Sequence, residues 1–447
     1  MHPAMKTLSL PAIVAVAAML WLPVPTASAL EMRTWLSIDG RMLEAELVRQ
    51  VGNDVELRDK DGKPIKLAKS SLSFGDLDYI EENAPADTAT KSLGSAPATK
   101  SKVPSPAKEV KVDTKTFKKE AGDFKINSRT YRVCETPHFK VMYMRPVDPI
   151  DMAELAERLW VDTAFFHSTF IPKWHDRKMG IILVSDDEAY GDVGSWYADM
   201  IGGTGQPNAK DEAERMRKTW PETSAGTVQM PAAQADEKGI FSDVTVFRAY
   251  TIPATIDANG KITKGKPQLV KGVWDSFRTH MIAHSMLSTQ SGSLNSTSKE
   301  GNFAIFAGFA FYKEISLTGK CGTNLIGTKG TSKDVTTSGG FQPDKNWPTE
   351  LKKMIRKGGE WKPSLTTLFA ATSESPSTPD IVFSYAFNRF LQSTPGRLTA
   401  FNKLCQKIDV ANQVPGLEEI AKLYGYDSAP ALETAWVTWM DSGEFSR

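Results

Sequence analysis

Cysteine, histidine and net charge are all scarce in this sequence. Its 447 residues include three cysteines and six histidines, and 54 lysines and arginines against 53 aspartates and glutamates leave a formal net charge of +1. A near-neutral chain has no overall field that would attract a polyanion, so nucleic acid is not an expected partner. The chain is 40% hydrophobic and 24% charged, an ordinary globular composition for one large core and a small module.

The three cysteines, Cys134, Cys321 and Cys405, are too far apart to form a metal-binding motif. An odd number allows at most one intramolecular disulfide, and the sequence does not choose among the three pairings. We expect these residues to pack as small buried apolar side chains. A phosphate-binding glycine-rich loop and a G-x-S-x-G elbow are also missing from the sequence.

Residues 1–29 have the three-part layout of a secretory signal peptide. Lys6 precedes an apolar run from Leu8 to Leu22, and the small residues Ala27-Ser28-Ala29 follow. Cleavage is expected after Ala29, which predicts an exported protein, periplasmic or extracellular, with no stable membrane insertion. A retained anchor is the alternative, although the run is near the short end of what spans a bilayer.

Residues 30–82 predict a small all-β unit with a short helical end. RTWLS and RMLEAELV are strand patterns on either side of Asp39-Gly40, and NDVELRD and KPIKLA repeat the arrangement around Asp61-Gly62. Several short strands in about fifty residues indicate a curled sheet or small barrel. The expected inward-facing residues of the second pair are Val55, Leu57, Ile65 and Leu67.

The motifs of this unit occur in a characteristic order. They are Arg33-x-Trp35, Asp39-Gly40, Glu44-Ala45-Glu46-Leu47, Val55-x-Leu57, Asp61-Gly62-Lys63 and Leu72-Ser73-x-x-Asp76-x-x-Tyr79. In this order the unit resembles the SLA-homology (SHD) domain. The resemblance implies an SH3-like barrel and, more loosely, a peptide-binding role.

Residues 83–118 are rich in proline, alanine, serine, threonine and lysine and nearly lack large apolar side chains. Such a segment cannot bury enough apolar surface to offset its ordering entropy, so we predict a disordered linker between two folded parts. Its lysines could alternatively contact an anionic surface weakly.

Residues 119–447 predict a larger α+β domain with a mostly helical C-terminal half. HFKVMYM and MGIILVS are strand patterns, and the segment between them has helical spacing with a capping box from Asp151 and Glu154. Residues 201–240 are polar and contain glycine and proline, which predicts an inserted loop region. From Val270 onward the pattern is mostly helical, so the strands come early and the helices late.

His280 and His284 lie four residues apart in RTHMIAHSML, which reads as a helix. Positions i and i+4 share one helical face, so both imidazoles could reach one metal ion. Some twenty residues later comes a second segment, Ala307-Gly308-x-Ala310-x-Tyr312-x-Glu314. Further pieces in order are Thr136-Pro137-His138-Phe139, IILVS before Tyr190-Gly191, PSLTTLF, SYAFNRFL, Tyr424-Gly425, Trp436 and Trp439.

Together these pieces resemble the gluzincin metallopeptidases, in their exported peptidase-MA-like branch. The resemblance implies that His280 and His284 match two zinc ligands. It also implies that the general-base glutamate of the family is replaced by Met281, and its zinc-binding glutamate by Ala307. A thioether cannot take a proton from zinc-bound water, and a methyl group leaves two protein ligands where catalytic zinc usually has three.

A replacement ligand is hard to find in the sequence. Glu314 is seven residues beyond Ala307, roughly 10 Å along a helix axis, which is too far for a metal contact of about 2 Å. Glu300 is about as distant on the other side. His138 begins a strand and could approach only through the tertiary fold.

The sequence therefore predicts a non-catalytic exported protein that binds a protein or peptide, without catalytic residues or a cofactor. His280 and His284 would be vestigial metal ligands, or would simply pack between helices bonded to backbone or to a carboxylate. The alternative is an active zinc metallopeptidase with a rearranged site that uses His280, His284 and an unidentified third ligand. A purely structural role in the cell envelope is a third reading.

Overall fold

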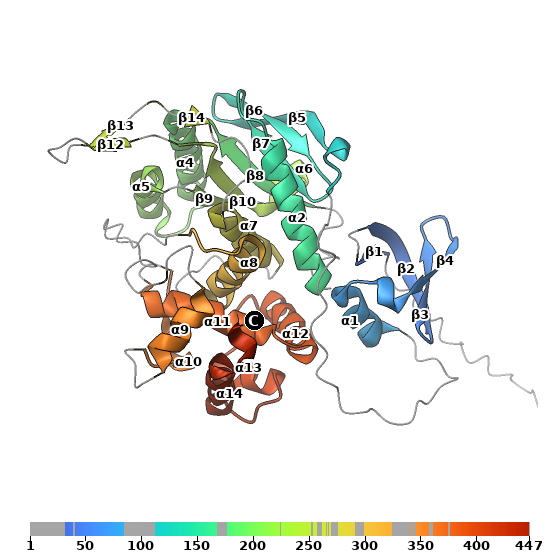
Figure 1. The fold of residues 1–447 in the computed structure, drawn as a ribbon. Coiled ribbons are helices and arrows are strands. Elements are labelled where there is room, and N and C mark those ends of the chain that lie inside the picture. Colours follow the sequence, from blue (N-terminus) through green and yellow to red (C-terminus); the bar gives the residue numbers. More distant parts are fainter. Residues whose placement is uncertain are drawn as a thin grey trace, which may run out of the picture.

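The computed structural model describes most of the chain from residue 32 to residue 446. The ranges outside this description are 39–40, 85–111, 168–176, 224, 252–253, 257–261, 265, 267, 270–275, 291–298, 324–340, 342–345, 357–360 and 374–375. Within it the protein has an N-terminal antiparallel sheet, a larger mixed sheet and a mostly helical C-terminal half (Figure 1). The predicted mixed α+β, multidomain architecture is thus confirmed at this level.

The N-terminal module is an antiparallel sheet followed by one helix. Its strands pair in the order β1-β2-β3-β4, as the sequence predicts, and a bridge between Ser37 and Leu72 curls the segment after β4 back onto β1. Alternate side chains point inward because successive residues of a strand face opposite sides of the sheet. The bounds are β1 (Arg33–Leu36), β2 (Met42–Val51), β3 (Asp54–Asp59), β4 (Pro64–Ala68) and α1 (Phe74–Asn83).

The buried residues of the module match the predicted inner face only in part. Val55 and Leu57 on β3 are fully buried, whereas Ile65 and Leu67 on β4 are half-buried because β4 is an edge strand. The predicted turn at Asp39-Gly40 lies outside the described residues.

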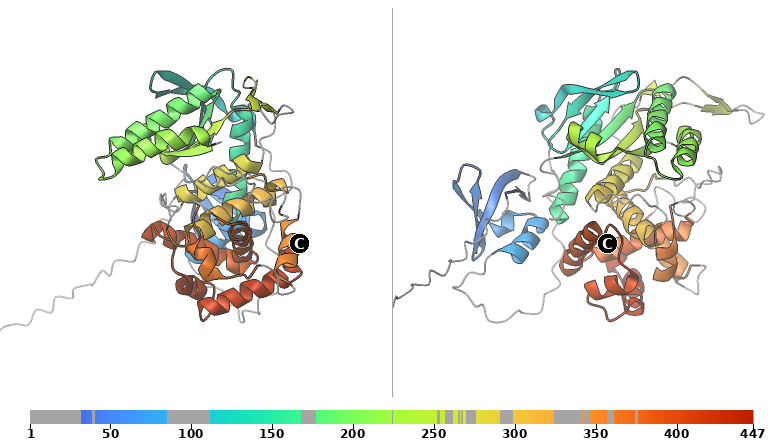
Figure 2. Two further views of the ribbon diagram at one scale, coloured as in Figure 1. Left: turned by 90° about the vertical axis from the view of Figure 1, so that its left-hand side faces the viewer. Right: turned by 180° about the vertical axis from the view of Figure 1, so that it is seen from behind.

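The second sheet has six strands in the order β5-β6-β7-β8-β10-β9, in which β7, β8 and β10 are parallel. Adjacent residues of β8 enter different cores: Ile181 packs on the side of α2, and Ile182 packs on the side of α4. Helices therefore cover both faces (Figure 2). The bounds are β5 (Lys118–Ile126), β6 (Arg129–Glu135), β7 (Phe139–Tyr143), α2 (Ile150–Phe166), β8 (Lys178–Val184), α4 (Asp187–Gly202), β9 (Ala225–Gln229) and β10 (Ile240–Arg248).

The prediction of a loop region over 201–240 is wrong. Two helices, α5 (Ala209–Thr219) and α6 (Ala232–Lys238), and the edge strand β9 fill this interval. The element α5 is polar on most of its surface but leads into Trp220, which is buried, stacks on Tyr190 and donates from Nε1 to the Tyr190 carbonyl over 2.9 Å. One aromatic anchor thus fixes a segment whose average composition is that of a loop.

Two predicted boundaries also need correction. The capping box of Asp151 and Glu154 is not formed, because α2 begins at Ile150, two residues earlier than an N-cap at Asp151 would set, and the Asp148 carboxylate accepts from the Ile150 N–H over 3.2 Å. The linker ends before residue 118, because Phe117 is buried in the main core and β5 starts next to it. Most of the predicted linker, 85–111, lies outside the described residues.

The C-terminal half is helical, as predicted. Short strand pairs precede it: β11 (Tyr250–Thr251) with β14 (Gln268–Leu269), and β12 (Ala254–Ile256) with β13 (Ile262–Lys264). In the described part of the chain no helix is long and apolar enough to cross a membrane. The helices are α7 (Ser276–Gln290), a π-helical turn η4 (Phe303–Ala307), α8 (Gly308–Thr318), α9 (Trp347–Ile355), α10 (Leu365–Ala370), α11 (Thr378–Leu391), α12 (Pro395–Ala411), α13 (Leu417–Leu423) and α14 (Ala429–Asp441).

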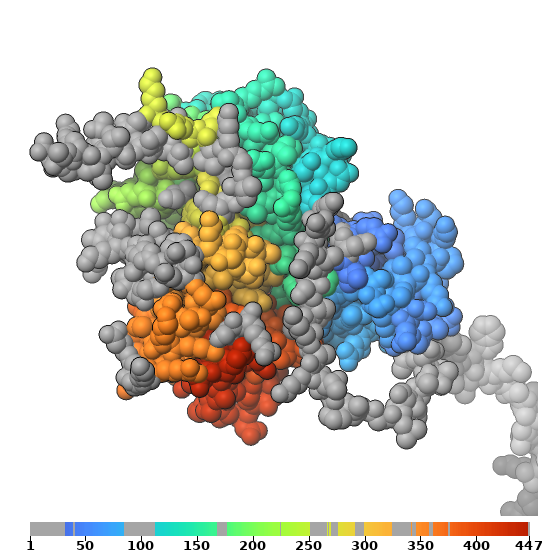
Figure 3. Space-filling model, in the orientation of Figure 1, coloured from blue at the N-terminus to red at the C-terminus, as the bar shows by residue number. Residues whose placement is uncertain are grey.

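The three cysteines and two residues of the N-terminal module are part of the buried interior. Cys134, Cys321 and Cys405 are all buried thiols, as expected, although the Cys321 thiol lies 3.7 Å from a carboxylate oxygen of Glu314 rather than in wholly apolar surroundings. Leu36 and Phe74 of the N-terminal module belong to the same apolar cluster as the helices of the large domain. The module is a separate lobe in the space-filling view but packs directly on the large domain (Figure 3).

Candidate functional site

The two histidines of interest lie on α7, a helix buried between β10 and α8. His280 is almost fully buried and His284 is half-buried. On the side of β10 the helix makes polar contacts, including one of 2.9 Å from Thr245 Oγ1 to Ser285 Oγ. The predicted helix is thus present, and its i, i+4 spacing places both imidazoles on one side of it.

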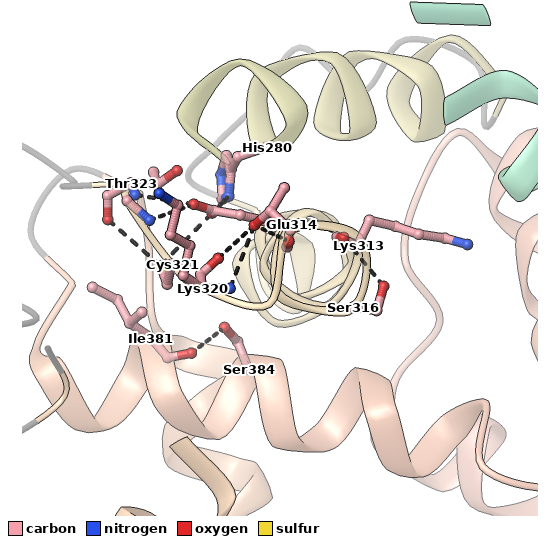
Figure 4. Close-up of polar contacts among 11 residues, drawn as sticks. His280, Lys313, Glu314, Ser316, Lys320, Cys321, Thr323, Ile381 and Ser384 are labelled. Carbon is pink, nitrogen blue, oxygen red and sulfur yellow. Dashed lines mark hydrogen bonds and ion pairs between the residues drawn. The ribbon is translucent and has the colours of Figure 1, made fainter. Parts of the chain in front are cut away.

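The η4–α8 segment lies antiparallel to α7 and contacts both histidines. Phe306 is next to His284, with ring centroids 6.2 Å apart, and Phe311 is next to His280 at 4.4 Å. One turn further along, the Glu314 Oε2 atom lies 3.1 Å from His280 Nδ1 (Figure 4). The two helices therefore lie side by side, as predicted. The histidine–carboxylate pair of His280 and Glu314 is a polar contact between them.

Glu314 is held from several directions at once. Its Oε1 atom accepts from the backbone N–H of Gly322 over 2.7 Å and of Thr323 over 3.1 Å, and the Cys321 thiol lies 3.7 Å from Oε2 (Figure 4). The same loop passes close to the start of α7, where a Cβ at Gly322 would lie 2.4 Å from Ser276 Oγ. The carboxylate is thus fixed by backbone geometry as well as by His280.

This arrangement sets the tautomer of His280. A carboxylate accepts hydrogen bonds, so Nδ1 carries the proton and donates to Glu314, which leaves the lone pair on Nε2. A second partner of this kind orients metal-binding and proton-accepting histidines in many proteins. His280 is therefore a rigidly oriented base.

His284 is kept neutral by its surroundings. Burial, with a smaller contribution from neighbouring His280, lowers the pKa of His284 to about 4. Its closest aromatic neighbour is Phe306, so it lies in an apolar environment. His284 is therefore uncharged near neutral pH, whether it acts as a ligand or only packs between the helices.

Zinc does not fit the side chains that the structure describes. Catalytic zinc usually has three protein ligands, and in this part of the chain no group of three His, Cys, Asp or Glu side chains could hold a metal ion. Glu314 faces His280 Nδ1 rather than the ion that Nε2 could bind. Met281 and Ala307, at the positions where the family resemblance implies glutamates, offer a thioether and a methyl group.

The exclusion of Glu314 by axial distance concerned only a metal contact, for which Glu314 is too far from Ala307, and it did not anticipate the contact of Glu314 with His280. Its distance was measured from Ala307, whereas the antiparallel packing brings it to the other histidine, His280. His280 and Glu314 are 34 residues apart in the sequence, and only the packing of α7 on α8 brings them into contact.

The second helix of the site is built around a close helix crossing. Gly308 follows the π-helical turn, and a Cβ there would lie 2.2 Å from Asn388 Nδ2 and 2.5 Å from the Ser384 carbonyl. Asn388 on α11 donates to the Ala304 carbonyl over 2.7 Å, a carbonyl inside the π-helical turn. Turns of this kind occur often at functional sites, and here one is clamped between α7 and α11.

His138 is not part of this site. Its Nδ1 lies 2.7 Å from Glu157 Oε2, and its ring stacks on Trp160 with centroids 3.5 Å apart. Burial alone would raise the pKa of Glu157, but the charge and hydrogen bonds of His138, with that of Thr136, lower it overall. This second histidine–carboxylate pair ties β7 to α2 inside the core.

His167 is at the C-terminal end of α2 and is also buried, while His175 lies outside the described residues. The Nδ1 atom of His167 is 2.8 Å from Asn402 Oδ1 on α12. Burial first, and the charge of Lys313 second, lower the pKa of His167 to about 3.

These neutral histidines predict an acid-sensitive fold. A histidine ordinarily titrates near 6.5, so the unfolded chain takes up protons below that pH while folded His167 does not until about pH 3. Stability should therefore fall as pH drops from 6.5 toward 3, by up to about 1.4 kcal/mol per pH unit for one such group. His284 adds a contribution of the same sign, down to about pH 4. Urea unfolding at pH 7, 6, 5 and 4 measures the slope.

The matched variant for this test is His167→Asn, which keeps an N–H near the position of Nδ1 but does not titrate. We expect its stability to depend less steeply on pH than that of the natural chain. Equal slopes for the two proteins between pH 6.5 and 4 would contradict the assignment.

Comparison of the chain with family models, curated proteins and solved structures finds no match in any of the three. The chemistry of the site is therefore read from its geometry. A neutral imidazole whose Nδ1 donates to Glu314 can accept a hydrogen bond at Nε2, whereas the Glu314 carboxylate already accepts from His280, Gly322 and Thr323. They do not supply the general-base carboxylate that a metallopeptidase places beside its metal-bound water.

Proposed function

We propose that this protein is an exported, non-catalytic binding protein, built from an SHD-like N-terminal module and a degenerate gluzincin-like domain. Its ligand is a protein or peptide. The observation that carries the proposal is the state of Glu314, the carboxylate bonded to His280: its oxygens accept from His280, Gly322 and Thr323. A carboxylate engaged in this way supports the packing of α7 on α8 rather than the activation of a water molecule.

Two further features support this proposal. The residues that hold α7, η4 and α11 together are intact, since Gly308 permits the close crossing and Asn388 bonds to Ala304. The positions that the resemblance implies for catalysis are Met281 and Ala307, neither of which can accept a proton. A domain that keeps these helix contacts but lacks carboxylates at positions 281 and 307 is suited to binding a ligand without hydrolysing it. The rearranged metallopeptidase would need a third ligand from outside the described residues.

The test compares the mature natural chain with His280→Ala. Each is incubated with zinc and a mixture of tryptic peptides, and the products are identified by mass spectrometry. We expect no cleavage that depends on His280, and less than one zinc ion bound per chain in equilibrium dialysis. Peptide cleavage that is present in the natural chain and lost in His280→Ala would overturn the proposal.

Binding is tested in parallel by selection from a random-peptide display library on the immobilised chain. Peptides should be enriched, and the enriched sequences should bind His280→Ala as well as they bind the natural chain. Failure to enrich any sequence would count against a peptide ligand. The double variant Met281→Glu with Ala307→Glu is the control for the helix alignment, and it should bind zinc more tightly than the natural chain without gaining full activity.

A further inference from the structure

The N-terminal module contacts the large domain through α1 and the end of β1. In Figures 1 and 2, α1 lies against one end of α2 and next to α12. Leu36 and Phe74 from the module enter the apolar cluster of the large domain, so the contact has a hydrophobic part. Among the described residues, the buried carboxylate at this contact is that of Asp78, which is 6% exposed.

Two aspartates on α1 face in different directions. Residues two apart on a helix are separated by about 200° around the axis, so Asp76 and Asp78 point to opposite sides. Asp76 faces the interior of the module, where its Oδ1 accepts from Arg33 over 2.7 Å. Asp78 faces the large domain and is free of that internal role.

The Asp78 carboxylate is received by two donors on α12. Thr399 Oγ1 donates to Oδ1 over 2.8 Å, and Asn402 Nδ2 donates to Oδ2 over 2.9 Å. The two donors are three residues apart and therefore lie on the same face of α12, about one turn from each other. Each oxygen of the carboxylate thus has its own donor, and the spacing of the donors matches that of the two oxygens.

Asn402 is oriented by the large domain itself. Its Oδ1 lies 2.8 Å from His167 Nδ1, and both residues are buried, at 2% and 0% exposure. An amide whose oxygen accepts from an imidazole N–H must direct its NH₂ group the other way, which here is toward Asp78. The donor is therefore aimed at the carboxylate by a group that does not belong to the interface.

We propose that Thr399 and Asn402, oriented by His167, form a carboxylate-binding site whose occupant is Asp78 of the same chain. The site docks the module in one orientation. Within the described residues no cation forms an ion pair with Asp78, so recognition depends on neutral donors and on their direction. A side chain without acceptor oxygens at position 78 would leave Thr399 Oγ1 and Asn402 Nδ2 without their acceptor, so the site requires an acceptor there.

This docking decides which surface of the module is open. The α1 face is occupied by α2 and α12, so a ligand of the module has to bind elsewhere on it, on the sheet side. Contacts between domains of one chain resemble transient interfaces unless they are large and apolar. A directed polar contact beside the apolar contacts of Leu36 and Phe74 gives specific docking that can still be released.

The experiment uses the full mature chain with a protease site inserted within 85–111. After cleavage the natural module should stay with the large domain at micromolar concentration and co-elute in gel filtration. Asp78→Ala and Asn402→Ala should each weaken retention by about tenfold or more, as for loss of one partner of a buried hydrogen-bonded charge. Glu82→Gln, which removes the rim pair with Lys403 (3.6 Å), is the matched control and should change retention by less than about threefold.

An exchange of partners separates this proposal from general loss of folding. Asn402→Asp alone places two carboxylates together and should release the module. The pair Asp78→Asn with Asn402→Asp restores one donor and one acceptor, and leaves His167 a carboxylate oxygen to bond, so retention should recover to within about threefold of the natural chain. Separation of the natural module on cleavage, full retention by Asp78→Ala, or no recovery in the exchanged pair would each overturn the proposal.

Discussion

Glu314→Ala is expected to destabilise the large domain by about 3–5 kcal/mol, because it removes one acceptor from several buried donors. The backbone N–H groups of Gly322 and Thr323 and the Nδ1–H of His280 all lose their partner. Each unsatisfied buried donor costs about 1–3 kcal/mol. Urea unfolding measures the loss, and hydrogen exchange at Gly322 and Thr323 should accelerate with it.

The isosteric variant Glu314→Gln separates the backbone contacts from the histidine contact. Its amide oxygen can still accept from the loop, but its NH₂ group donates toward His280, so the imidazole must move its proton from Nδ1 to Nε2. We expect a loss of about 1–2 kcal/mol and a change of tautomer visible in the ¹⁵N chemical shifts of the imidazole. Glu300→Ala, at an exposed turn, is the matched control and should stay within about 0.5 kcal/mol of the natural chain.

A small effect of Glu314→Ala would have a clear meaning. If unfolding changes by less than 1 kcal/mol, the loop at 321–323 does not depend on the carboxylate, and the rigid orientation of His280 is not established by it. If the natural chain shows the Nε2–H tautomer, the available lone pair is on Nδ1 and the interpretation of the site as an oriented base is wrong.

Local pattern predicted most of the elements of this fold. The alternation over β1 to β4 and the helical spacing of α2 and α7 each depend on residues close together in the chain, so the sequence shows them directly. The prediction of a loop over 201–240 failed because the structure of this segment depends on Trp220, whose stacking partner Tyr190 is thirty positions away. Composition averaged over such a segment does not register one buried indole.

The site was predictable in its helices and not in its contacts. The spacing of His280 and His284 places them on one helical face whatever surrounds them. The partner of His280 depends on the direction in which α8 packs on α7 and on the loop that closes over Glu314. Asp78, Asn402 and His167 lie on three different elements, and no local pattern relates them.

Arg33→Met is expected to destabilise the N-terminal module by about 3–5 kcal/mol, since it leaves a buried carboxylate without its counter-ion. Arg33 and Asp76 are both almost fully buried, and the pair is joined at 2.7 Å. The guanidinium also lies 3.9 Å from the ring centroid of Tyr79 and 4.8 Å from that of Trp35. Hydrogen exchange of the β2 and β3 amides reports unfolding of the module separately from the large domain.

The same pair gives the variant a defined pH dependence. Burial raises the pKa of Asp76 to about 6, although the charge of Arg33 and the hydrogen bonds from Leu36 and Ser73 oppose the rise. Removing Arg33 removes the largest opposing contribution, so the pKa should rise further. A carboxyl group that is harder to ionise when folded stabilises the fold below its ordinary pKa near 3.9 and loses that contribution as pH rises through the folded value. The stability of Arg33→Met should therefore be closest to that of the natural chain at low pH and furthest from it at pH 7 and above.

Adding Asp76→Asn should recover part of the lost stability at pH 7, because the amide carries no charge to bury. A loss that is independent of pH, or one that Asp76→Asn makes worse, would show that the guanidinium stabilises the module through its contacts with Trp35 and Tyr79 rather than through the carboxylate.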